Sequence, residues 1–166
     1  MPVMNLNKSN ATNYQLIFPK LPLEKYYETS KEFTLNIYGA VVPSITLDQE
    51  EHRWQGGKAF SDNGEVTFGE WIVDFAVDSE FKNWKVIYNW MMAIHNNEDK
   101  YGYVRDKGYM VDAALYIMTN YRNKALMLRF YNIWPLAMSE VYFSKRDSGD
   151  DLLSNITFLY DRYEVF

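Results

Sequence analysis

The change of hydrophobic period that decides the fold falls within residues 64–95, which read GEVTFGEWIVDFAVDSEFKNWKVIYNWMMAIH. From Glu65 to Val77 apolar residues alternate with a period of two and occupy both faces, which predicts a central or covered strand. Asp78-Ser79 marks a helix start, since either side chain can cap free backbone N–H groups. From there the period becomes helical and predicts an amphipathic helix over 80–95. The apolar residues that recur at helical spacing, and should pack the helix on a sheet, are Phe81, Trp84, Ile87, Tyr88, Met91, Ile94 and His95.

On both sides of this stretch, apolar residues mostly recur at every second position, and turn signals separate the apolar runs. Residues 45–64 are largely polar and end in the turn signal Ser61–Gly64, so they predict a long protruding hairpin or loop. Trp134-Pro135 is expected to break a strand, because proline cannot donate to a ladder of hydrogen bonds. Further strands are expected at 13–18, 33–37, 110–121, 125–133, 139–144 and 155–166.

The 166 residues suit one domain over 1–166, with a polar N-terminal arm at 1–12 that we expect to be ordered only in an assembly. The fold class is mainly β: a β-sandwich or barrel with one inserted α-helix. The N-terminus has no basic segment followed by an apolar one, and no apolar run approaches the length of a membrane span. We therefore expect neither a signal peptide nor contact with a membrane.

Composition restricts the function further. The chain has a formal charge of −5 and no cysteine, which disfavours specific binding of nucleic acid and excludes thiol chemistry, disulfides and cysteine-based zinc sites. Aromatic residues make up 17% of the chain, a load that suits both a core and contacts between subunits.

A search for catalytic or metal-binding patterns finds none that is complete. His52 lies in a polar run and His95 at the end of the predicted helix, and neither has further ligands at a matching spacing. Gly56-Gly57-Lys58 lacks the first glycine and the final hydroxyl residue of a phosphate loop. Two acidic turns, 62–65 and 147–151, lack the spacing of a calcium loop. The sequence therefore predicts a structural or binding protein with no catalytic residue, no cofactor and no metal.

Two blocks carry a resemblance to a known family. The first is residues 64–75, which run into the predicted helix, and the second is 130–143, followed by the aromatic run 156–166. Together they resemble the tail tube proteins of contractile-tailed (myovirus-type) bacteriophages, closely over 64–166 and loosely over 13–63. The positions that match the family's motifs are Thr67, Phe68, Trp71, Trp134, Pro135, Glu140 and Val141.

The resemblance implies a structural virion protein. Six copies would form a ring whose inner strands close a barrel, and stacked rings would form the hollow tube through which DNA is ejected. It implies the tail sheath and baseplate proteins as further partners, assembly in the host cytoplasm, and a lumen that DNA passes without specific binding. The charge of −5 agrees with an acidic lumen. In the family the long hairpin contacts the adjacent ring, a role that falls here on Gln49, Glu50, His52, Arg53 and Trp54.

Other functions stay open. The connector 19–31 is longer than in typical members, which leaves a single-ring relative at the baseplate, a tube initiator or a tail terminator. The tube protein of a type VI secretion or similar contractile injection system is a further alternative. A monomeric ligand-binding β-barrel belongs to a different class, as does a hydrolase whose carboxylates are placed by the fold. The oligomeric state discriminates the structural readings from these two.

Overall fold

The computed structural model describes residues 12–19, 36–54, 56–95, 109–144 and 151–166. Most of the predicted N-terminal arm and of the strand predicted at 33–37 lies outside them. The described elements, in chain order, are β1 (Tyr14–Ile17), β2 (Ile37–Ala40), β3 (Ile45–Trp54), β4 (Gly57–Phe68), β5 (Trp71–Ala76), α2 (Lys82–His95), β6 (Val111–Met118), β7 (Lys124–Met138), β8 (Leu153–Leu159) and β9 (Arg162–Val165).

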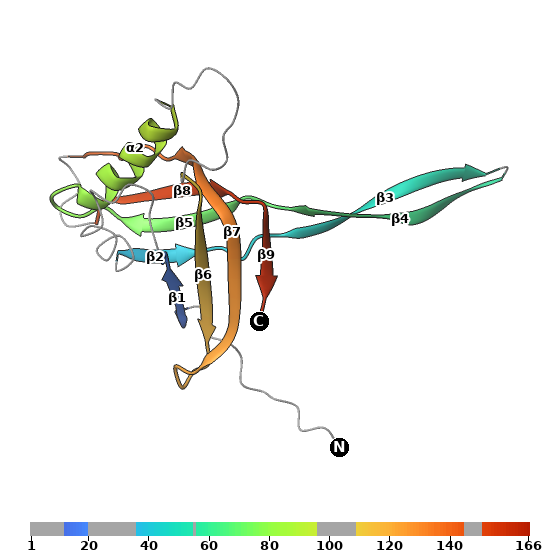
Figure 1. The fold of residues 1–166 in the computed structure, drawn as a ribbon, viewed down its shortest axis with the longest axis horizontal. Coiled ribbons are helices and arrows are strands. Elements are labelled where there is room, and N and C mark those ends of the chain that lie inside the picture. The colour runs from blue at the N-terminus through green and yellow to red at the C-terminus, as the bar shows by residue number, and fades with distance from the viewer. Residues whose placement is uncertain (1–11, 20–35, 55, 96–108, 145–150) are drawn as a thin grey trace.

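The long strand β7 belongs to two sheets. Its first part pairs with β6 and β9, and its second part pairs with β8. We call β1, β6, the first part of β7 and β9 sheet A, and the second part of β7, β8, β5 and β2 sheet B. All these pairings are antiparallel, and the strands of sheet A run across those of sheet B (Figure 1). The mainly β fold with one helix that the sequence predicts is confirmed.

The passage of β7 from one sheet to the other is fixed at Asn132. This residue has a φ of 54°, a left-handed conformation that asparagine tolerates better than most residues. Its backbone N–H donates to Oδ1 of Asp112 at 3.3 Å, and its Nδ2 donates to Oδ2 of Asp161 at 2.7 Å. Asp161 lies between β8 and β9, where that segment also changes sheet, so one polar contact holds both corners together.

The core lies between the two sheets and under α2. Its centre is Trp71, which is fully buried and stacks on Phe130 with ring centroids 4.0 Å apart. Such aromatic contacts add to the large apolar area that each ring removes from water. The other residues of this cluster that are fully buried, or nearly so, include Val73, Phe75, Ile87, Trp90, Leu115, Leu128, Ile133, Ile156 and Phe158.

Helix α2 lies within the predicted range 80–95, and of the two predicted caps, Asp78 and Ser79, the structure shows Asp78 in that role. Oδ1 of Asp78 accepts a hydrogen bond from the N–H of Lys82 at 2.8 Å, which satisfies a free donor of the first turn. The predicted packing face is partly wrong. The buried residues are Asn83, Val86, Ile87 and Trp90, and Trp84, Met91 and Ile94 are half-buried against the core. Tyr88, which was predicted to pack, is exposed.

The buried Asn83 explains this rotation of the helix. Its Nδ2 donates to the carbonyl of Ala76 at 2.6 Å, and its Oδ1 accepts from the N–H groups of Asp78 and Trp84. These three hydrogen bonds tie the end of β5 to the start of α2 and compensate the burial of a polar side chain. Periodicity counts an asparagine as polar and places it in water.

The predicted turn at Ser61–Gly64 is wrong. β3 and β4 pair continuously from Ile45 with Phe68 out to Trp54 with Gly57, so the chain reverses after Trp54. Residues 61–64 instead lie at a register shift in β4, where Gly64 has a φ of 69°. A glycine at positive φ suits a bulge as well as a turn, and the pairing with β3 decides between them.

The long strands predicted at the centre and at the C-terminus are each divided in two. The run 65–77 is interrupted at Gly69-Glu70, where the N–H of Gly69 donates to the carbonyl of Ser44 and the chain passes from β4 into the core strand β5. The run 155–166 is interrupted at Tyr160-Asp161, at the corner between β8 and β9. In both places the chain passes from one sheet to another. The alternation of apolar residues continues across the break, so the sequence predicted one strand where the structure has two.

Two further expectations about the second block are wrong. Trp134-Pro135 does not end β7, which continues to Met138. β7 is the edge of sheet B there and has a register shift after Pro135, and both an edge and a bulge tolerate proline. No strand forms over 139–144, where a single bond from the N–H of Ser139 to the carbonyl of Asn155 continues the pairing.

Candidate assembly surfaces

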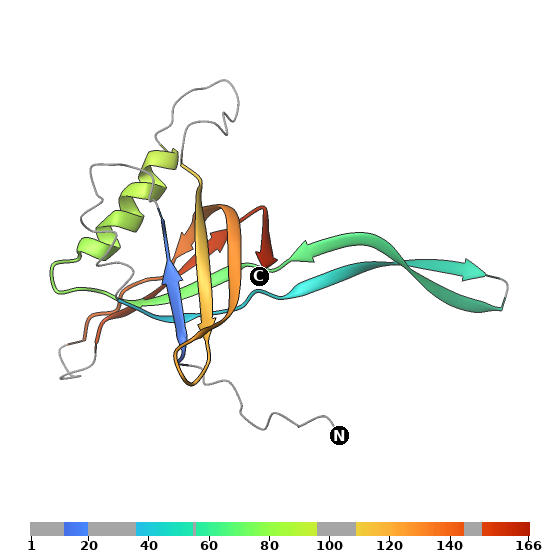
Figure 2. The same ribbon diagram turned by 60° about the horizontal axis from the view of Figure 1, so that its bottom comes forward.

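The β3–β4 hairpin projects from the body on the side away from α2 (Figures 1 and 2). Ile45 opposes Phe68 and Leu47 opposes Val66, so these four side chains share one face of the ribbon. Ile45, Leu47 and Val66 are 56%, 63% and 43% exposed, and we call them the hairpin's apolar face. A two-stranded ribbon is marginally stable alone, so an uncovered apolar face indicates that something else packs on it.

The residues predicted to contact an adjacent ring lie together in the outer part of β3. Gln49, Glu50 and His52 are exposed, and Nε2 of His52 lies 2.8 Å from Oγ of Ser61 and 3.8 Å from Oε2 of Glu50. The backbones of Arg53 and Trp54 pair with Lys58 and Gly57, and their side chains lie outside the described residues.

One ion pair crosses the same part of the ribbon. Glu51 and Lys58 are 3.0 Å apart and largely exposed. An exposed pair of this kind contributes about 0–1 kcal/mol, so it helps to keep the strands in register and leaves both side chains accessible to a partner.

The residues that match the family's motifs divide into two groups in the structure. Trp71 and Pro135 are buried, and Phe68 packs on the rings of Tyr160 and Tyr163 at 6.2 and 5.1 Å. Those positions build the core and the base of the hairpin. The remaining ones are at least partly accessible: Trp134 and Val141 are half-buried, whereas Thr67 and Glu140 are exposed.

Sheet A ends in two edges among the described residues. β1 pairs with β6 alone, and β9 pairs with β7 alone. The pairing of β9 is extended by two bonds between Phe166 and Met127, and the hydroxyl of Tyr163 donates to the carbonyl of Pro43 at 3.2 Å. Free edges of this kind present unpaired backbone groups to a further strand.

The outward face of sheet A carries paired charges. Nη2 of Arg129 donates to Asp112 at 3.2 Å, and Nε of Arg162 donates to Glu164 at 3.3 Å. The hydroxyl of Tyr131 donates to Oε2 of Glu164 at 2.9 Å, and this bond, with that from Arg162, lowers the pKa of Glu164. Both arginines lie over the ring of Tyr131, at 4.9 and 4.5 Å. The two carboxylates of this network, Asp112 and Glu164, are thus each paired with an arginine.

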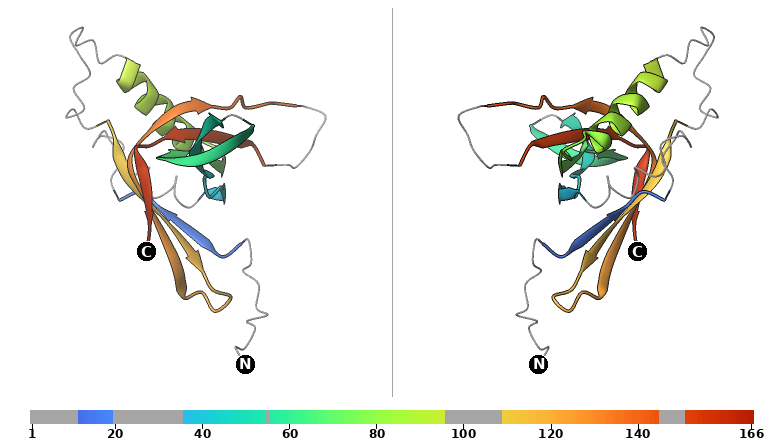
Figure 3. Two further views of the ribbon diagram at one scale, coloured as in Figure 1. Left: turned by 90° about the vertical axis from the view of Figure 1, so that its right-hand side faces the viewer. Right: turned by 90° about the vertical axis from the view of Figure 1, so that its left-hand side faces the viewer.

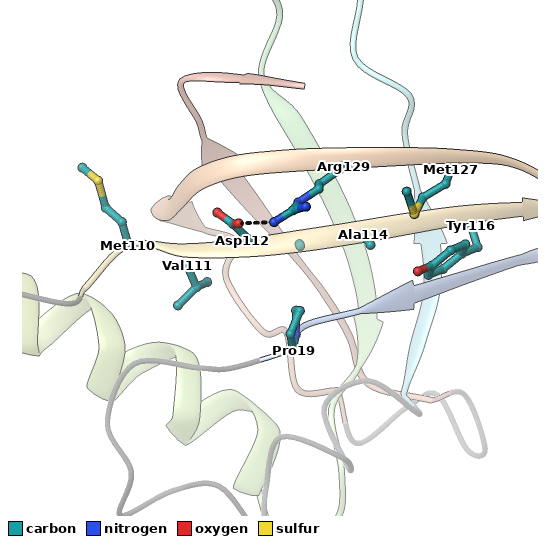
Figure 4. A pocket seen from close by; sticks show the side chains of 9 residues that line it. Pro19, Met110, Val111, Asp112, Ala114, Tyr116, Met127 and Arg129 are labelled. Atoms are coloured by element: carbon teal, nitrogen blue, oxygen red, sulfur yellow. Dashed lines mark hydrogen bonds and ion pairs between the residues drawn. The ribbon is translucent and has the colours of Figure 1, made fainter. Parts of the chain in front are cut away.

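A shallow concavity of about 540 Å³ adjoins this network on the same face (Figure 4). The ion pair of Asp112 and Arg129 lies at its rim, and methionine and aromatic side chains supply much of its apolar surface. The residues that line it are Pro19, Met110, Val111, Asp112, Ala113, Ala114, Tyr116, Met127 and Arg129.

Aromatic side chains beside α2 form a partly accessible surface, to which Trp84 contributes although it also packs on the core. Trp84 stacks on Tyr88 with centroids 5.4 Å apart, and Phe81 stacks on Phe143 at 6.0 Å. Tyr88 and Phe143 are 43% and 66% exposed. We call these four residues the aromatic patch. The sequence signal for this patch is that α2 contains more apolar positions than one face of a helix can hold.

Within the described ranges, no three of the histidine, aspartate and glutamate side chains come together as metal ligands would. The structure likewise describes no helix that is long and apolar enough to cross a membrane. The features that remain are surfaces for association: two sheet edges, a projecting hairpin and the aromatic patch.

Comparisons with known proteins concern both the sequence and the fold. No family model matches the sequence. The chain is 29% identical over 166 residues to the tail tube terminator protein of Enterobacteria phage T4, a match that covers 96% of this chain and 89% of the T4 protein. In sequence and in fold, the chain is similar to the phage tail tube proteins. This likeness to structural proteins agrees with the prediction, made from the sequence, that the protein is not an enzyme.

Two solved structures share the tail tube fold over nearly the whole chain. A chain of the sheath–tube complex of the PVC extracellular contractile injection system, in its extended state, superposes with a TM-score of 0.65 at 12% identity and covers 98% of this chain and 93% of that one. A chain of the tube-terminating cap of the anti-feeding prophage gives a TM-score of 0.66 at 13% identity, with 96% and 91% covered. At these identities the likeness concerns the fold alone.

Proposed function

We propose that this protein terminates the tail tube of a contractile phage tail, as a single ring at the end of the tube. The observation that carries the proposal is the 29% identity to the T4 tail tube terminator along 96% of the chain. The sequence by itself favoured the main tube subunit and kept a terminator as an alternative. The relation to a named terminator now favours that alternative.

Sheet A supports a role in a ring. Among the residues that the structure describes, its four strands end in β1 and β9, each paired on one side, and a sheet with two open edges loses both when copies join edge to edge in a closed circle. Such a contact is heterologous, because one edge of a subunit meets the other edge of its neighbour. Six copies close the ring, as in the family that the sequence resembles.

The paired charges on the outward face of sheet A suit the wall of a channel for DNA. Asp112 and Glu164 each have an arginine within 3.3 Å, and Lys124 lies 4.0 Å from the ring centroid of Tyr116, so the phosphate backbone meets neither a strong repulsion nor an array of free cations. DNA therefore passes without specific binding.

The outer part of the hairpin extends past the body of its own subunit (Figure 1). In the proposed ring, Gln49, Glu50, His52, Arg53 and Trp54 contact the last ring of the tube. The protein is then a component of the virion tail, assembled in the host cytoplasm next to tube and sheath proteins.

The test is electron microscopy of the purified protein, alone and with the tube protein of the same phage. We expect isolated six-fold rings, and tubes that stop growing and carry an extra ring at one end when the protein is added. Long tubes formed by this protein alone would identify the main tube subunit. A monomer at all concentrations, with no effect on tube growth, would refute any role in the tube.

A further inference from the structure

The hairpin and helix α2 are complementary in charge as well as in apolarity. Residues 45–68 contain five acidic residues against Arg53 and Lys58, a formal charge of −3. Residues 82–95 contain two lysines and no acidic residue, a formal charge of +2. Opposite charges at the rim of two apolar surfaces favour their association and fix its orientation.

The cation beside the aromatic patch is Lys85. It is exposed, and it lies four residues after Phe81 and three before Tyr88, so it borders the patch on the same side of α2. Lys82 is engaged by Glu80 at 2.6 Å, which leaves Lys85 as the lysine positioned to meet an acidic partner.

One chain does not bring these two surfaces together. The hairpin leaves the body on the side away from α2, as the views along the hairpin also show (Figure 3). Two complementary surfaces on different sides of one molecule meet only between copies, in a head-to-tail contact that propagates around a ring.

We infer that the hairpin's apolar face (Ile45, Leu47, Val66) packs on the aromatic patch of a second copy of this chain. The occupant of the patch is thus the neighbouring subunit, with Lys85 facing the acidic ribbon. This contact joins neighbouring subunits in addition to the edge pairing of sheet A, farther from the centre of the ring. It uses the base of the hairpin and leaves the outer part free. The inference rests on the proposed ring and adds to it which surfaces join the subunits.

The absence of cysteine makes a cross-linking test direct. Leu47→Cys and Tyr88→Cys place one thiol on each surface. Under mild oxidation the double variant should give a ladder of disulfide-linked subunits, and a mixture of the two single variants should give dimers only. Tyr121, at the β6–β7 turn and 82% exposed, supplies the matched control: Leu47→Cys mixed with Tyr121→Cys should give no dimer.

A second measurement uses association itself. Lys85→Glu should raise the concentration needed for ring formation at least tenfold, and the wild-type ring should weaken as salt screens the contact. In a mixture of Leu47→Asp and Tyr88→Asp, the intact hairpin of the Tyr88 variant can still pack on the intact aromatic patch of the Leu47 variant. The mixture should therefore form dimers that neither variant forms alone.

The outcomes separate this inference from the proposed function. If the wild type forms no ring, alone or on tube ends, and does not affect tube growth, the proposed function fails. If rings form but the Leu47–Tyr88 pair does not cross-link, or the Tyr121 control cross-links equally, the inference is wrong and the ring stands. Cross-linking of Leu47→Cys to the tube protein and not to its own neighbour also overturns it, because the occupant is then a different chain.

Discussion

Replacing Asn83 by alanine removes three hydrogen bonds that join β5 to α2. The carbonyl of Ala76 and the N–H of Asp78 each lose a partner in a partly buried position, while the N–H of Trp84 loses one in the first turn of the helix. An unsatisfied buried group costs about 1–3 kcal/mol. We expect the free energy of unfolding to fall by about 3 kcal/mol, since the two strand-end groups carry most of the loss.

Urea denaturation of the monomer, followed by tryptophan fluorescence, measures this change. With a slope of about 2 kcal/mol per molar urea, the midpoint should fall by about 1.5 M. Asn89→Ala is the matched control, because Asn89 lies on the same helix and is only half-buried. It should change stability by less than about 0.5 kcal/mol. Equal effects of the two substitutions, or a loss below about 1 kcal/mol for Asn83→Ala, would refute the role given to Asn83.

Three further predictions concern the core, alkaline pH and the hairpin. Trp90 donates through Nε1 to the carbonyl of Tyr109 at 2.7 Å, whereas Nε1 of Trp71 is buried with no partner in the described structure, so Trp90→Phe should cost about 1–2 kcal/mol more than Trp71→Phe in the same urea assay. Burial raises the pKa of Tyr160 to about 12 from 10.0, so the folded state favours its neutral form; this stabilisation is complete below pH 10 and is lost as pH rises from 10 to 12. Tyrosinate absorbance should show a late-titrating group that Tyr160→Phe removes, and an unchanged titration would contradict the assignment. Replacing residues 52–54 by alanine should leave a soluble protein that still forms rings but does not attach to tube ends in electron micrographs; normal attachment would exclude the outer hairpin as the contact.

The sequence predicted those elements that depend on interactions between residues close together in the chain. The cap at Asp78 and the change of period after Val77 placed the helix to within two residues, because a free N–H and its acceptor lie a few residues apart. Alternation likewise predicted strands at 110–121 and 125–133, which form β6 and most of β7 and pair as neighbours in sequence. The mainly β class followed from these elements together.

Features that depend on distant partners could not be predicted in this way. Pro135 lies inside a strand because β7 forms the edge of sheet B at that point, a fact that depends on β8 some twenty residues later. The glycine at 64 marks a bulge and not a turn because of its pairing with β3. The orientation of α2 depends on a buried asparagine, so Tyr88, which is exposed, was predicted to pack on the sheet. The five contact residues of the hairpin were placed by resemblance, and they remain a prediction.

The double membership of β7 has a mechanical consequence. A force that enters through the edges of sheet A reaches sheet B along two covalent backbones, β7 and the β8–β9 segment, and through the core packed between the sheets. At the bend, the bonds from Asn132 to Asp112 and Asp161 tie these two backbones together and brace β7 against straightening. In a ring of such subunits, we expect the two connected sheets to resist radial stretching together.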